Sequence, residues 1–183
     1  MATLTLRPTS GTGNSWSNVA NIYDGNQSTS GSVSVSRLNY TSRTLVLDFD
    51  TSVIPSGATI NSATLTIRSQ AGKTTITAYV DINQDSANRV ISKKQSTGAT
   101  NYTADVTSYI SDLTSVEVSV SNNNWSSNTF DLYELWIDVD YTEPVTPSGT
   151  FNIKLGNTTI NNIYLGSTKI NKVYVGTNLV YEN

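Results

Sequence analysis

The sequence predicts an all-β protein: an antiparallel β-sandwich or jelly roll followed by a small C-terminal β-meander module. Three observations predict it. Apolar and polar residues alternate along several short segments, clusters of Gly, Asn, Ser and Pro separate these segments, and helix signals are almost absent. Alternation with a period of two is typical of strands that have one buried face and one solvent-exposed face. With 183 residues, 37 % of them hydrophobic, the chain is long enough for one sizeable core.

The strands are expected, in chain order, over residues 3–7, 33–37, 45–49, 62–68, 75–82, 115–121 and 133–141. In the last of these, Tyr133 and the alternate residues up to Tyr141 should face the core, while Glu134, Trp136 and Asp138 face outward. The segment 105–113 is the one place where a helical turn or two is expected, with Asp105 or Thr107 as its cap.

A Pro/Gly-rich linker over 143–150 is predicted to separate a sandwich domain (1–142) from a repeat module (151–183). Beyond the linker the sequence repeats every ten residues, with Gly156, Gly166 and Gly176 at equivalent positions. A glycine followed by small polar residues is typical of a tight turn, so a meander of four short strands is expected.

This module is too small to hold much core of its own, so it is predicted to need a partner surface. Ile160 has an even number and Ile163 an odd one, and residues of even and odd number point to opposite faces of a regular strand. Apolar residues would therefore lie on both faces. We therefore interpret the module as an assembly element. Its candidate contact residues are Ile163, Tyr164, Leu165, Ile170, Val173, Tyr174 and Val175.

Composition excludes several classes of site. The chain has no cysteine and no histidine, so it cannot form disulfides, thiolate or imidazole metal sites, or triads built on His or Cys. Its net charge of -3 argues against nucleic-acid binding. The sequence has no long apolar run, so no membrane span is expected. It does not begin with basic residues followed by an apolar segment, so no signal peptide is expected. We expect no enzyme activity and no cofactor.

Two carboxylates, Asp138 and Asp140, share one face of a predicted strand. Such a pair could serve in glycoside hydrolysis or bind calcium, but a solvated strand face is the favoured interpretation. The segments that begin at Asp24 and Asp81 resemble oxygen-ligand loops superficially and lack the spacing of an EF-hand.

Aromatic residues are the other candidates for a binding site. Trp16 and Trp125 lie in loops rich in small polar residues, the second beside Asn123 and Asn124. A flat ring next to amide groups can stack on a sugar and bond its hydroxyls, whereas the alternative is a tryptophan that plugs the end of the sandwich.

By parity, Trp136 and Tyr79 point away from the core. Aromatic rings on an outer face are typical of contact surfaces, so an intersubunit or interdomain contact is predicted for these two residues.

The tail sequence IYLGSTKINKVYVGTNLVYEN resembles C-terminal modules of virion proteins from tailed bacteriophages. The segments IPSGATINSATLTIRS, DVTSYI and LYELWIDVDYT resemble jelly-roll domains of phage structural proteins and carbohydrate-binding-like modules. This resemblance implies a non-enzymatic structural component of a phage particle, of the capsid-decoration, head-fibre or tail-accessory type. It would assemble in the bacterial cytoplasm with other capsid or tail proteins into the virion.

A homo-oligomer is expected, preferably a trimer by analogy with threefold fibrous virion parts. The alternative is a carbohydrate-binding module that attaches a particle or an enzyme to cell-surface glycans.

Overall fold

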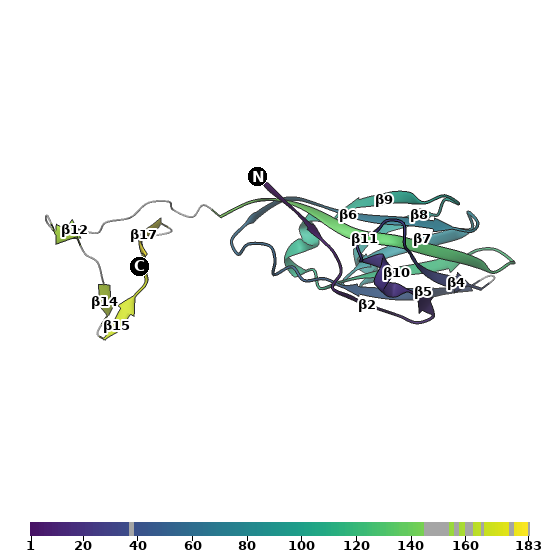
Figure 1. Ribbon diagram of the computed structural model, residues 1–183, viewed down its shortest axis with the longest axis horizontal. Coiled ribbons are helices and arrows are strands. Elements are labelled where there is room, and N and C mark those ends of the chain that lie inside the picture. The colour runs from purple at the N-terminus through teal and green to yellow at the C-terminus, as the bar shows by residue number, and fades with distance from the viewer. Residues whose placement is uncertain are drawn as a thin grey trace. The chain divides into compact units, whose positions relative to one another are not determined.

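A computed structural model of the chain describes the backbone of residues 1–36, 39–144, 154–155, 158–159, 163–165, 167–175 and 178–182. It describes side chains over 1–36, 43–144, 165 and 167–173. The chain divides into two units, Met1–Pro144 and Val145–Asn183 (Figure 1). Of the predicted linker, residues 145–150 lie outside the described part.

The first unit is a sandwich of two antiparallel sheets, which confirms the predicted fold class (Figure 1). Sheet A has the order β3-β4-β11-β6-β9, and β1 also pairs with β11. Its strands are β1 (Ala2–Leu6), β3 (Trp16–Ser17), β4 (Gly31–Val35), β6 (Thr59–Ala71), β9 (Thr100–Asp105) and β11 (Asn128–Thr142). Sheet B has the order β2-β5-β10-β7-β8. Its strands are β2 (Ser10–Gly13), β5 (Asn39–Asp48), β7 (Ile76–Ile82), β8 (Arg89–Lys94) and β10 (Ser115–Asn122).

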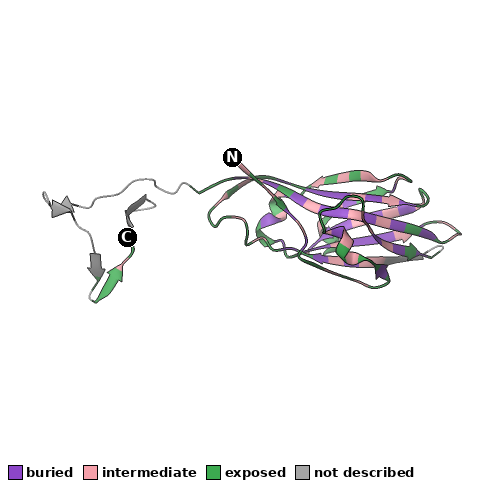
Figure 2. Ribbon diagram, in the orientation of Figure 1, coloured by how far each residue is buried: buried purple, intermediate pink, exposed green. Residues whose placement is uncertain are grey.

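The core lies between the two sheets and is built from the alternating apolar residues that the sequence predicts. Figure 2 shows buried residues alternating with more exposed ones along many of the strands. Sheet A contributes Leu65, Ile67, Phe130, Leu135 and Ile137, and sheet B contributes Leu45, Leu47, Val80, Val116 and Val118, all of them fully buried. Burial of apolar surface at roughly 25 cal/mol per Å² is the main force that holds the two sheets together.

The long strand β11 shows one departure from strict alternation. Its pairing with β6 shifts between Leu132 and Glu134, and a bulge of this kind changes which face the next side chain occupies. Tyr133 was expected to face the core and is only half-buried, so that expectation is wrong. Glu134 was expected on a solvated face, yet it is fully buried. Beyond the bulge, Leu135, Ile137, Val139 and Tyr141 face the core as predicted.

Four strands were not anticipated: β2, β3, β8 and β9. Each contributes few buried apolar side chains; in β8 only Ile91 is buried. The predicted turn at 105–113 is the 3-10 helix η3 (Thr107–Asp112), and Asp105 accepts hydrogen bonds from the backbone and hydroxyl of Thr107. Two further 3-10 helices are η1 (Val19–Ile22) and η2 (Ser86–Asn88). In the part of the chain that the structure describes, no helix has the length and apolar character needed to cross a membrane.

Within the second unit, the strands that the structure describes form three short hairpins spaced about ten residues apart. They are β12 (Lys154–Leu155) with β13 (Thr158–Thr159), β14 (Ile163–Leu165) with β15 (Thr168–Ile170), and β16 (Lys172–Val175) with β17 (Asn178–Glu182). Each pair flanks one of the repeated glycines, as predicted from the turn sequences. The described strands form three separate two-stranded sheets, however, and not one continuous sheet of four strands.

Candidate functional site

The candidate site is the loop between β10 and β11, which carries Trp125. The Trp125 side chain is 74 % exposed, whereas most large apolar residues of the sandwich are buried. The plug alternative is therefore wrong for Trp125. Of its predicted neighbours, Asn123 is exposed and Asn124 is half-buried.

Buried Asn122 anchors this loop from the sandwich side. Its amide nitrogen donates to the Ser126 carbonyl at 2.9 Å and lies 3.3 and 3.4 Å from the carbonyls of Ser36 and Val35. Its amide oxygen accepts from the Thr75 hydroxyl at 3.1 Å. One side chain with no exposed surface thus joins the loop to its neighbours on both sides.

A second buried amide, Asn128, fixes the other end of the loop. Its nitrogen donates to the Lys73 carbonyl at 3.1 Å, and the Lys73 ammonium donates to the Ser126 hydroxyl at 3.0 Å. Gly72 permits this close approach, since a Cβ at that position would lie 2.7 Å from Oδ1 of Asn128. The β6–β7 turn and the Trp125 loop are consequently held as one assembly.

Local hydrogen bonds also order the tip. The backbone N–H of Trp125 donates to Oδ1 of Asn124 at 2.6 Å, and the N–H of Asn123 donates to the Thr75 carbonyl at 3.3 Å. The ring of Trp125 is therefore presented to solvent on an ordered backbone, with amide and hydroxyl groups around it. Holding a ligand-contacting ring in place before binding lowers the entropy cost of association.

The other predicted loop tryptophan does not belong to this site. Trp16 is only 9 % exposed and packs edge-on against Phe130, with ring centres 5.9 Å apart. It lies in the short strand β3, opposite Val33. The prediction that Trp16 contacts a glycan is wrong, because its ring is buried in the core. The alternative prediction, a tryptophan that closes the end of the sandwich, agrees with this position.

The outward-facing aromatic residues of the two sheets are only half-buried, as their parity predicts. On sheet A, the Trp136 indole donates to Asp138 at 2.9 Å. On sheet B, the Arg89 guanidinium lies 4.5 Å from the ring centre of Tyr79. Arg89 also forms a bidentate ion pair with buried Asp81, with N–O distances of 2.7 and 2.8 Å. Tyr79 is thus partly covered by its own chain.

Buried Glu134 lies on the outer side of sheet A and is paired with Arg7. The Nε–Oε1 distance is 2.8 Å, and the Glu134 side chain has no exposed surface. This ion pair joins β11 to the segment that follows β1. The sequence carries a signal for it only in the charge of Glu134, because its partner Arg7 lies 127 residues away in the sequence.

A carboxylate on sheet B has an altered ionisation. Partial burial raises the pKa of Glu117 above its ordinary value of 4.5, and the neighbouring Asp81 carboxylate raises the pKa further, while Arg89 opposes the shift. The folded state therefore binds a proton on Glu117 more readily than the unfolded state does. Its ionised form weakens the fold as pH rises from about 4.5 through the raised pKa.

We expect Glu117→Gln to stabilise the protein slightly at pH 7, by about 0.5 kcal/mol or less because partial exposure screens the charge. The gain should vanish below pH 4.5, where Glu117 is protonated in both states. Thermal melts of both proteins at pH 4 and pH 7 check this. An equal difference at the two pH values would contradict the proposed cause.

In the tail, the structure describes the side chains of only some predicted contact residues. Leu165 is 76 % exposed, and Ile170 and Val173 are half-buried. The side chains of Ile163, Tyr164, Tyr174 and Val175 lie outside the described part. Among the described residues, no group of three or more acidic side chains is placed to hold a metal ion.

No protein-family model matches the chain, and no curated protein matches its sequence. The solved structures that resemble the chain include the following two. One is a protein crystallised with a xylogluco-oligosaccharide, 12 % identical, with a TM-score of 0.41 and 76 % of this chain covered. The other is a family two carbohydrate esterase from Cellvibrio japonicus, 14 % identical, with a TM-score of 0.33 and 80 % of this chain covered. The match spans 37 % of the length of each of those proteins.

Proposed function

We propose that the chain is a non-enzymatic attachment protein whose sandwich binds carbohydrate through the Trp125 loop. The observation that carries this proposal is the exposed ring of Trp125 on a loop that buried amides hold in place. Tryptophan is enriched at contact surfaces relative to the rest of a protein's surface.

The chemistry around the ring suits a sugar. The indole face offers an apolar surface for C–H groups, while the amides of Asn123 and Asn124 and the hydroxyl of Ser126 can exchange hydrogen bonds with hydroxyls. The Lys73 ammonium donates to the Ser126 hydroxyl at 3.0 Å and so orients that hydroxyl on the loop.

We further propose that this attachment protein is a structural component of a bacteriophage particle, as a capsid decoration, head fibre or tail accessory. The support is the sequence resemblance of the tail together with its three hairpins. Isolated two-stranded hairpins are only marginally stable in water, and Leu165 is 76 % exposed. Other copies of the chain, preferably two around a threefold axis, or capsid or tail proteins would cover such surfaces. Assembly would take place in the bacterial cytoplasm, and the mature location would be the virion.

We expect Trp125→Ala to weaken glycan binding by about 1–3 kcal/mol, or roughly five- to 150-fold, by analogy with the loss of a ring that stacks on nucleic-acid bases. The ligand is first selected on a glycan array with the full chain, and titration calorimetry then compares wild type with the variant. Trp125→Phe should retain part of the affinity because it keeps a ring.

Val53→Ala is the matched control, since Val53 is also a large apolar residue in a loop and is 55 % exposed. It should bind as wild type does. Equal affinities for wild type and Trp125→Ala would overturn the assignment of this loop. An array on which no glycan is retained would overturn carbohydrate binding itself.

A further inference from the structure

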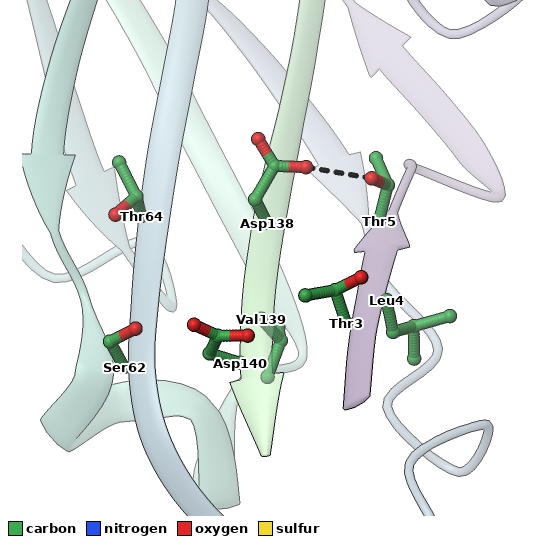
Figure 3. A pocket seen from close by; sticks show the side chains of 8 residues that line it. All are labelled: Thr3, Leu4, Thr5, Ser62, Thr64, Asp138, Val139 and Asp140. Carbon is green, nitrogen blue, oxygen red and sulfur yellow. Dashed lines mark hydrogen bonds between the residues drawn. The ribbon is translucent and has the colours of Figure 1, made fainter. Parts of the chain in front are cut away.

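A polar groove of about 320 Å³ lies on the outer face of sheet A, where β1, β11 and β6 run side by side (Figure 3). Six polar side chains line it: Thr3, Thr5, Ser62, Thr64, Asp138 and Asp140. The groove is formed by strand residues, and the candidate loop of Trp125 contributes nothing to its lining.

Strand register arranges these side chains in two rows. Asp138 pairs with Thr5 on one side and with Thr64 on the other, while Asp140 pairs with Thr3 and Ser62. Residues two apart on a strand point to the same face, so the rows are about 6.8 Å apart. Each row therefore offers a carboxylate between two hydroxyls.

Trp136 extends the same face by a third row. Its indole nitrogen donates to Oδ2 of Asp138 at 2.9 Å, and the Thr5 hydroxyl donates to Oδ1 of Asp138 at 2.7 Å. Both oxygens of Asp138 are thus oriented by the protein, and Asp138 in turn fixes the indole. The ring stays half-exposed beside the groove.

The charge of the lining indicates the class of ligand. No Lys or Arg is among the lining residues, so an anionic group would meet only carboxylates and hydroxyls. Carboxylates accept hydrogen bonds, and hydroxyls both donate and accept them. A ligand rich in O–H donors with apolar C–H faces matches this set together with the indole.

We propose that this groove is a second carbohydrate site, which binds a neutral oligosaccharide with Trp136 as the stacking ring and Asp138 and Asp140 as acceptors for sugar hydroxyls. The proposal deepens the proposed function, since it supplies a second contact for the same class of ligand. It uses different residues, so the two sites can succeed or fail separately.

The three tryptophans of the chain give a direct readout. Trp16 lies in the core, Trp125 in the loop and Trp136 at the groove, so their indole N–H signals in a ¹H–¹⁵N spectrum report on three environments. The full chain is titrated with cellohexaose, xylohexaose and mannohexaose in turn, and separately with calcium chloride. We expect one of the hexasaccharides to shift the Trp136 indole and the Thr5 and Thr64 amides. These shifts should persist in Trp125→Ala.

Variants of the groove identify the contacts. Trp136→Ala and Asp140→Asn should each raise the Kd read from the Thr5 and Thr64 shifts at least tenfold. Asp131→Asn is the matched control, because Asp131 lies on the same strand, pairs with Gln70 and does not line the groove. It should leave the Kd unchanged.

The remaining outcomes overturn the proposal in distinguishable ways. Shifts of the Trp125 indole alone would leave the proposed function standing and remove the second site. If calcium shifts the Asp138 and Asp140 amide signals and none of the sugars does, the groove is a cation site. If neither the Trp125 nor the Trp136 indole signal shifts with any of the sugars or with calcium, the result counts against both the groove and the loop.

Discussion

Trp16→Ala is expected to reduce the free energy of unfolding by about 3–5 kcal/mol, the range for truncating a large aromatic side chain in a core. The Trp16 ring is almost fully buried and packs against Phe130. It also lies so close to Gly13 that a Cβ there would come within 2.9 Å of the ring. Urea unfolding followed by circular dichroism measures the change without depending on tryptophan fluorescence.

Trp125→Ala is the control for this prediction, since it removes the same side chain from an exposed position. We expect a change within about 0.5 kcal/mol, as for most surface substitutions. A large loss of stability in Trp125→Ala, or a negligible one in Trp16→Ala, would contradict the separate roles assigned to these two residues.

Asn122→Ala is expected to reduce the free energy of unfolding by about 2–4 kcal/mol. The substitution removes the partner of several groups in a fully buried setting, including the Ser126 carbonyl and the Thr75 hydroxyl. A buried polar group left without a partner costs about 1–3 kcal/mol. Because Asn122 also holds the Trp125 loop, glycan affinity should fall at temperatures where the variant is still folded.

Ser127→Ala provides the comparison, because Ser127 is an exposed residue of the same loop. Its unfolding curve and its affinity should match those of wild type. If Asn122→Ala melts as wild type does, the loop is not anchored as described. If it is destabilised but binds the glycan normally, the anchoring is irrelevant to recognition.

The core strands could be predicted because their residues alternate over long stretches between two covering layers. Val116, Val118 and Val120 are fully buried and are separated by residues on the other face. The edge strands could not be predicted this way, since β8 buries only Ile91 and β9 buries no side chain fully. At the edge of a sheet, pairing with one neighbour suffices for a strand, and hydrophobic periodicity carries little of that information.

The site could be predicted only in part, for a related reason. Trp16 and Trp125 occur in similar Ser- and Asn-rich surroundings, yet one ring fills the core and the other is exposed. Their environments depend on partners distant in sequence, such as Phe130 for Trp16 and Lys73 for the Trp125 loop. The groove on sheet A likewise requires the pairing of β1 with β11, which local patterns do not specify.

We propose that recognition belongs to the sandwich and assembly to the tail, two separate units of the chain. Sedimentation velocity of residues 1–144, compared with that of the full chain, tests this separation. This fragment retains all of β11, including Tyr141 and Thr142, which pair with Ala2 and Thr59. We predict that the full chain sediments as an oligomer, preferably a trimer, and that the fragment sediments as a folded monomer with a cooperative melt. A fragment that sediments as the same oligomer as the full chain would contradict the assembly role of the tail.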